Sequence, residues 1–121
     1  MDIKPLNLAG LINENGLNAQ RLLPWPTLNA PFEGSWCVIS PGSQSTLHAH
    51  HEYEIFIAVA GRASLESHGQ RHPFVVGDIV FFPPNSSHSV INDSAEDFAM
   101  YSIWWDAEMS QRFLNRHAGE S

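Results

Sequence analysis

The chain has 121 residues, of which 43% are hydrophobic and 16% charged, with a formal net charge of −7 at pH 7. This length suits one domain with one core. The acidic balance argues against nucleic acid or an anionic membrane as a partner. A single cysteine, Cys37, excludes an internal disulfide, and we expect it to pack in a strand as a small apolar side chain. With no apolar run near ~18 residues and no secretion signal, the sequence predicts a cytoplasmic protein.

Residues 1–35 show little periodicity because proline and glycine interrupt them repeatedly. We expect an N-terminal arm with one helical turn near residues 8–12 and a strand around residues 19–23. The arm is too apolar for a free tail, and it therefore should pack on the barrel or on a dimer partner.

Residues 36–106 change to a β pattern of short aromatic or β-branched segments separated by turn residues. An all-β sandwich or barrel is predicted. Within residues 54–60 both faces are apolar apart from Glu54, which predicts a strand buried on both sides and a carboxylate that needs a partner. Residues 107–121 show helical spacing and predict a short C-terminal helix and tail. The expected strands are residues 35–40, 45–50, 54–60, 62–67, 71–76, 78–82, 88–92 and 98–105.

Histidine and glutamate gather ahead of the third of these apolar segments. His48 and His50 are two residues apart, so both imidazoles leave an extended strand on the same face. Glu54 follows at another even step, and His88 comes directly after a turn-like stretch at residues 83–87. Three imidazoles and one carboxylate from different strands predict a transition-metal site, with zinc, iron, nickel, copper or manganese as suitable ions.

The same residues resemble the motifs of the cupin family. The pattern G-x5-H-x-H-x3,4-E-x6-G is filled at every fixed position, and G-x5-P-x-G-x2-H-x3-N at all but one, where Asn85 replaces glycine and tolerates the left-handed conformation. The resemblance implies a double-stranded β-helix, or jelly-roll, barrel. It also implies one divalent metal, zinc first and iron, manganese or nickel as alternatives, held by His48, His50, Glu54 and His88. The matching residues are Gly42, His48, His50, Glu54, Gly61, Gly77, Pro83, His88 and Asn92.

The resemblance leaves the catalytic roles around this metal less defined. Glu54 and Tyr53 are the residues we expect near the substrate as a base, while His51 and Glu52 are expected in a solvated turn. One alternating set of residues 98–105 should line the barrel and the other should pack outside it, and the sequence leaves open which set does which. The aromatic and apolar residues predicted for the pocket wall are Tyr53, Phe56, Phe82, Met100, Tyr101, Trp104 and Trp105.

The function favoured by the sequence is a metal-dependent enzyme acting on a small molecule inside the barrel. Its substrate is expected to be neutral or cationic, because Arg62 and Arg71 lie outside the motifs and offer no clamp for an anion. A finer resemblance, in residues 48–56 and 101–106, is to zinc cupins that work beside methionyl-tRNA-synthetase-like enzymes and join two amino acids through an N–N bond. The third alternative is a non-catalytic binding or sensor module. Exposed sheet edges and the apolar arm predict a homodimer.

Overall fold

The computed structural model of the protein describes residues 1–28 and 31–119, and in these ranges it is mostly β. Six strands form one sheet in the order β1-β2-β3-β9-β4-β7, and three form a second sheet in the order β6-β5-β8. The elements are η1 (Leu8–Gly10), β1 (Ile12–Glu14), β2 (Leu17–Arg21), β3 (Glu33–Ile39), β4 (Tyr53–Ala60), β5 (Arg62–Ser67), β6 (Gln70–Val75), β7 (Ile79–Phe82), β8 (Ser89–Ile91), β9 (Phe98–Trp105) and α1 (Ala107–Gly119).

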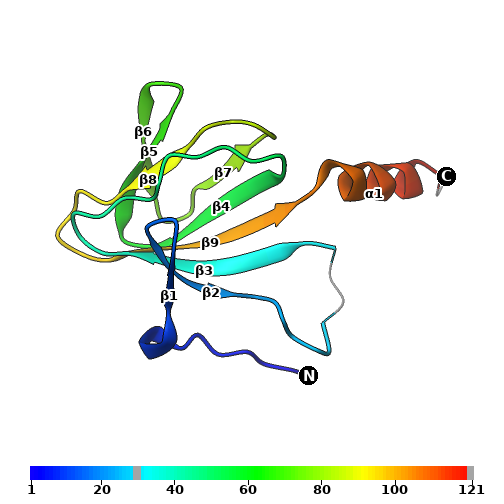
Figure 1. Ribbon diagram of the computed structural model, residues 1–121, viewed down its shortest axis with the longest axis horizontal. Coiled ribbons are helices and arrows are strands. Elements are labelled where there is room, and N and C mark those ends of the chain that lie inside the picture. The colour runs from blue at the N-terminus through cyan, green and yellow to red at the C-terminus, as the bar shows by residue number, and fades with distance from the viewer. Residues whose placement is uncertain (29–30, 120–121) are drawn as a thin grey trace.

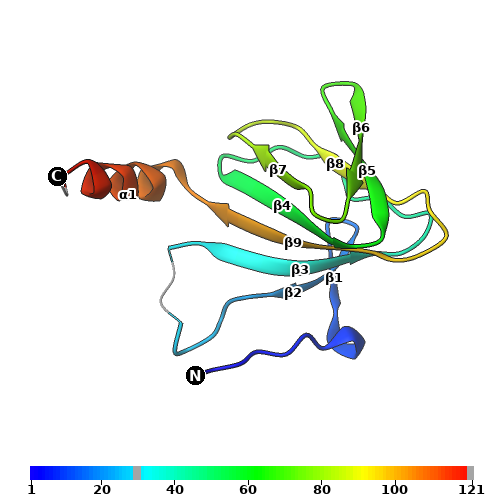
Figure 2. The same cartoon turned by 180° about the vertical axis from the view of Figure 1, so that it is seen from behind.

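The two sheets face each other, and α1 projects from the end of β9 beyond them (Figure 1, Figure 2). Side chains from both sheets fill the space between, among them Ile39 and Met100 from the larger sheet and Phe74 and Val90 from the smaller. Cys37 belongs to this core, and burial raises the pKa of its thiol to about 12. The thiol therefore stays protonated and packs as the apolar residue that the sequence predicts. No helix among the described residues is long and apolar enough to cross a membrane.

The N-terminal arm is more regular than the sequence suggests. β1 and β2 form a hairpin, and β2 pairs with β3 from Asn18 opposite Val38 to Arg21 opposite Ser35. The arm therefore extends the larger sheet of its own chain. The helical turn is present at Leu8–Gly10, and the strand predicted at residues 19–23 starts and ends two residues earlier. The sequence missed β1, which has only three residues.

The strand predicted at residues 45–50 is wrong as a regular strand. This segment runs beside β8 through two isolated bridges, Gln44 with Ile91 and His48 with His88. Between the two bridges the chain advances four residues, from Gln44 to His48, while the paired segment advances three, from His88 to Ile91. One extra residue in one of two paired segments defines a β-bulge. The other predicted strands are present with small changes at their ends, and those at residues 62–67 and 98–105 match β5 and β9 in full.

The predicted burial of β4 on both faces is also wrong. Glu54, Phe56 and Ala58 are buried, while the alternate residues Ile55 and Ile57 are only half-buried. One face of β4 is directed to the interior and the other to the outside, as is common in an antiparallel sheet. β9 alternates in the same way, with Met100 and Ser102 on its inner face and Tyr101 and Ile103 on its outer face. The structure thus resolves the question that the sequence left open for residues 98–105.

Asn92, the last residue of the second motif, stabilises the fold and lies outside the metal site. Its side chain is fully buried and its Nδ2 donates hydrogen bonds to the carbonyl oxygens of Ile39 and Glu96, each at 2.8 Å. Its Oδ1 accepts hydrogen bonds from the backbone N–H of Ser94 at 3.0 Å and from the Ser94 hydroxyl at 2.7 Å. One amide therefore joins β3 to the loop between β8 and β9.

We predict that Asn92→Ala lowers the free energy of unfolding by about 2–4 kcal/mol, because removal of the amide leaves several buried donors and acceptors without partners. Asp93→Ala is the matched control, since Asp93 is the exposed neighbour, and it should change stability by less than about 0.5 kcal/mol. Urea unfolding followed by tryptophan fluorescence measures both. Equal stability of the two variants would contradict this role for Asn92.

Candidate metal centre

Four side chains from three segments converge at one end of the space between the sheets. His48 and His50 come from the irregular segment beside β8, Glu54 from the start of β4, and His88 from the residue before β8. One potential ligand atom of each lies within 4.8 Å of one in every other member. The prediction from the sequence that these four residues lie together is therefore confirmed by their positions.

Backbone carbonyl groups hold all three imidazoles in the same tautomer. Nδ1 of His48 lies 2.7 Å from the Thr46 oxygen, and Nδ1 of His88 lies 2.8 Å from the Ser86 oxygen. Nδ1 of His50 lies 3.1 Å from the oxygen of Glu52 in the same way. A carbonyl oxygen can only accept a hydrogen bond, so each Nδ1 carries the proton and each neutral ring is left with a lone pair on Nε2.

Glu54 is the centre of these contacts. Its Oε1 lies 3.1 Å from Nε2 of His50 and 2.9 Å from Nε2 of His88, and its Oε2 accepts a 2.8 Å hydrogen bond from the Ser102 hydroxyl. Burial alone would raise the pKa of Glu54, but its contacts with His88, Ser102 and His50 outweigh burial when a proton lies between the carboxylate and the imidazoles, and the pKa lies below its usual value. The carboxylate is therefore ionised at neutral pH.

The chemistry of these donors fits a divalent metal ion. Two Nε2 lone pairs directed at one carboxylate oxygen repel it unless a cation lies between them, either a proton or a metal. Three imidazoles and one carboxylate are ligands that zinc, iron, manganese and nickel accept. The hydrogen bonds at Nδ1 are the kind that orient histidine ligands in known metal sites. The site therefore suits a divalent metal, as the sequence predicts.

Aromatic rings close the inner side of the site. The ring of Phe82 stacks on His88, with centroids 4.0 Å apart and an angle of 10° between the planes. Phe56 meets the same imidazole edge-on at 5.5 Å. His88 is only 1% exposed, whereas His48 and His50 are half-buried. Solvent therefore reaches the site from the side of His48 and His50.

A cavity of about 280 Å³ leads from solvent to this site. Among the residues predicted for its wall, Phe56 and Trp104 line it. Tyr53 does not, because it precedes Glu54 on β4 and lies on the outer face, where its ring stacks between Phe81 and Trp105. The structure thus does not bring Tyr53 to the metal centre. Phe82 and Met100 are buried in the core, while Tyr101 and Trp105 are on the outer face of β9.

His51 is exposed, as the sequence predicts, but Glu52 is half-buried and lines the cavity. Its Oε1 lies 4.0 Å from Nδ1 of His50. His68 and His72 are exposed near the tip of the β5–β6 hairpin, and neither lines the cavity or belongs to the group of four. Asn85, at the position of the motif glycine, has the expected positive φ of 63° and its N–H donates to the His50 oxygen at 2.6 Å.

The sequence placed no basic residue near the four converging side chains, and here the structure differs. Arg21 lines the same cavity. The expectation of a neutral or cationic substrate rested on Arg62 and Arg71, whereas Arg21 lies in the N-terminal arm. Leu17, Ala19 and Arg21 alternate along β2 and line the same cavity, and Ala19 is only 4% exposed.

Comparisons with known proteins agree with this geometry. The model of the Cupin domain matches residues 35–104. A Cupin 2 conserved barrel domain protein from Salinispora arenicola CNS-205 has 59% identity and a TM-score of 0.87, over 97% of this chain and 98% of that one. The plu4264 protein from Photorhabdus luminescens has 40% identity and a TM-score of 0.86, over 98% of this chain and 99% of that one.

A curated relative is the oxalate-binding protein of Thermotoga maritima, which is 30% identical over 66 residues. The match covers 54% of this chain and 54% of the relative. The matched region therefore spans about half the length of that relative.

We predict that Ser102→Ala weakens zinc binding about 10- to 100-fold, because the hydroxyl orients the Glu54 carboxylate and such supporting contacts have effects of this size. Ser35→Ala is the matched control. Ser35 is also buried and lines the same cavity, but its hydroxyl donates to the Trp36 oxygen. Competition with a chromophoric chelator measures both affinities. Equal affinities for the two variants would show that Ser102 does not support the ligand.

Proposed function

The chain belongs to the cupin superfamily, and from this premise we propose that it is a metal-dependent enzyme that acts on a small organic acid. The observation that carries the proposal is the convergence of His48, His50, Glu54 and His88 at the inner end of a cavity open to solvent. A site with three or four protein ligands beside an open cavity has room for water or substrate, which distinguishes catalytic from closed structural sites.

The residues at the site would have distinct roles in metal binding and in the exclusion of water. His48, His50, Glu54 and His88 would hold the ion, and a divalent metal there would supply a Lewis acid for the substrate. We assign Glu54 as a ligand rather than a free base, since Ser102 occupies its Oε2 and its Oε1 lies among the imidazoles. The stacked ring of Phe82 keeps water from the inner side of His88.

An organic acid replaces the neutral or cationic substrate that the sequence favours. The matched relative from Thermotoga maritima carries the name oxalate-binding protein, and a carboxylate is a good ligand for every ion that this donor set accepts. Arg21 supports the same class of substrate, because it places a positive charge in the wall of the cavity.

We propose zinc as the resident metal, with iron, manganese or nickel as the ions that would point to other chemistry. A zinc cupin that works beside a synthetase-like partner in N–N bond formation stays a prediction from the resemblance. A non-catalytic sensor also stays a prediction, and it would use the same ligands. The three functions differ in whether the bound molecule is converted, and in whether a synthetase-like partner is required.

We predict that gently purified protein contains about one equivalent of divalent metal, and that the double variant His48→Ala with His88→Ala contains almost none, because two of four ligands are lost. Elemental analysis by mass spectrometry gives the metal content. Thermal unfolding with and without a chelator provides a second readout, since a metal that binds only the folded state stabilises it.

The double variant His51→Ala with His72→Ala is the control, because both imidazoles are exposed and outside the ligand set. It should keep the metal content of the parent. Parent protein that holds no metal, even after incubation with zinc, iron(II), manganese or nickel, would contradict the proposed function. Bound redox-active iron would favour an oxygen-dependent reaction over the zinc assignment.

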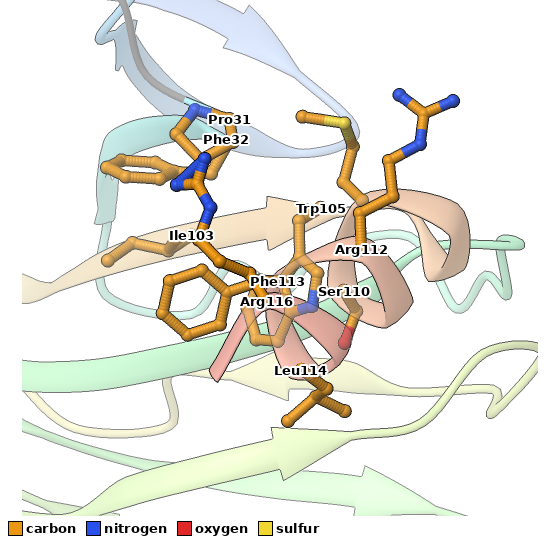
Figure 3. Close-up of a pocket in the computed structure, with 10 residues that line it drawn as sticks. Pro31, Phe32, Ile103, Trp105, Ser110, Arg112, Phe113, Leu114 and Arg116 are labelled. Carbon is orange, nitrogen blue, oxygen red and sulfur yellow. The ribbon is translucent and has the colours of Figure 1, made fainter. Parts of the chain in front are cut away.

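We also propose that the protein is a homodimer formed through the outer face of the larger sheet. A row of rings crosses this face from Phe81 on β7 through Tyr53 on β4 to Trp105 on β9. Phe81 is 52% exposed. The row continues into an apolar groove of about 620 Å³ between β9 and α1 (Figure 3). Its lining residues include Phe32, Ile103, Trp105, Met109 and Leu114.

A second copy of the chain fits this surface better than solvent does. Monomeric soluble proteins rarely expose a continuous apolar patch of this kind, and a patch repeated on two copies can pair with itself about a two-fold axis. In the groove, Arg112 and Arg116 are the charged lining residues among those described.

We predict that the parent has the mass of a dimer in light scattering across micromolar concentrations, and that Phe81→Lys shifts it to the monomer, because a charge buried in an apolar interface is left unpaired. Val75→Lys is the control, since Val75 is 44% exposed on the smaller sheet. It should stay dimeric. A monomeric parent throughout this range would contradict the proposal.

A further inference from the structure

The metal cavity has a second half that lies outside the family motifs. Residues of the N-terminal hairpin, which precedes the matched region 35–104, form one wall. Arg21 is the single lysine or arginine among the described residues that line the cavity. The residues contributed by the hairpin are Glu14, Asn15, Leu17, Ala19 and Arg21.

Arg21 is placed by contacts on two sides. Its Nε lies 3.1 Å from both carboxylate oxygens of Glu14, and its Nη2 lies 3.0 Å from Oε1. The guanidinium carbon stands 5.6 Å from the ring centroid of Trp104. Trp104 is the direct neighbour of Glu54 in the pairing of β9 with β4. The positive charge of Arg21 therefore lies over the ring of Trp104, which pairs across the sheet with the candidate metal ligand Glu54.

The guanidinium is both accessible and able to bind a second anion. Its side chain is 51% exposed, so a molecule entering the cavity can reach it. A guanidinium has five N–H donors, and Glu14 engages only those on Nε and Nη2. An exposed ion pair of this kind contributes little to stability, and exchange of Glu14 for a carboxylate of a ligand costs correspondingly little.

The charges in the cavity favour an anion only when a metal is present. Glu14, Glu52 and Glu54 face one arginine there, and this net negative charge would repel a carboxylate. A divalent cation cancels it and creates a second positive centre. Arg21 lines the same cavity as His48, His50 and Glu54, so a ligand with two carboxylates can reach both positive centres at once. A volume of about 280 Å³ holds about nine water-sized groups.

Building on the metal site proposed above, we propose that Arg21 is a ligand-binding residue that makes the cavity selective for short dicarboxylates. One carboxylate occupies the open side of the metal, and the other receives the guanidinium of Arg21 beside Trp104. The cavity accommodates a ligand the size of malonate or succinate. The N-terminal hairpin is in this view the element that sets specificity, while the cupin motifs supply the metal.

The test measures binding of matched acids to zinc-loaded protein by calorimetry. The probes are propanoate against malonate and butanoate against succinate, so that each pair differs by one carboxylate. We expect the parent to bind at least one dicarboxylate about tenfold more tightly than the matched monocarboxylate. Arg21→Gln should abolish this preference and keep the affinity for the monocarboxylate. Glu14→Gln should strengthen dicarboxylate binding, because it frees the guanidinium.

Arg62→Gln is the control, since Arg62 is an exposed arginine at the start of β5, and it should keep the preference of the parent. A preference that survives in Arg21→Gln, or that is absent from the parent, overturns the inference. Weaker binding in Glu14→Gln also overturns it, because the ion pair would then act only as a structural unit. The zinc content of every sample is measured in parallel. A parent that binds none of the four metals refutes the proposed function, whereas a metal-loaded parent without the preference refutes only the role of Arg21.

Discussion

The structure depends most on the buried carboxylate of Glu54. A carboxylate that is only 7% exposed costs several kcal/mol unless its oxygens are bound by donors or a cation. Ser102 satisfies Oε2, but the two imidazoles nearest Oε1 present lone pairs, because their protons are used at Nδ1 by backbone carbonyls. Only a cation can complete this arrangement. The burial of Glu54 and the histidines around it therefore impose the same requirement, which is a cation between the carboxylate and the imidazoles. Without a metal, a proton must lie there.

The fold meets this constraint by joining segments that are distant in sequence. The backbone of His48 pairs with that of His88, and the N–H of Asn85 binds the carbonyl of His50. These hydrogen bonds fix the two motifs to each other before any side chain is considered. Asparagine can replace the motif glycine here, because the position requires only a positive φ and a backbone N–H that donates to the His50 oxygen. Asparagine supplies both. The geometry of the metal centre is thus carried by the backbone, and its hydrogen bonds determine where the imidazoles lie.

The sequence predicted the parts of the molecule that local patterns control. Turn residues and alternation located nearly all strands, and the motif spacing located all four ligands. Two failures have a physical cause. Residues 45–50 have the composition of a strand, but a bulge between Gln44 and His48 interrupts their pairing, and a bulge depends on the partner segment. The position of Arg21 depends on the pairing of β2 with β3 and β9 across the sheet, which no local pattern contains. Its charge was visible in the sequence, but its distance from the site was not.

The alternation of β4 explains why one strand serves two surfaces. Glu54 is directed inward to the metal centre, and its neighbour Tyr53 is directed outward into the row of rings between Phe81 and Trp105. In β9 the same rule separates Ser102 and Trp104 from Trp105. Because the two faces share a backbone, a partner that packs on the outer rings also restrains the strands that carry Glu54 and Ser102. Dimer formation through this face would therefore rigidify the ligand set without contributing a residue to it, and a looser metal centre is the expected property of the separated monomer.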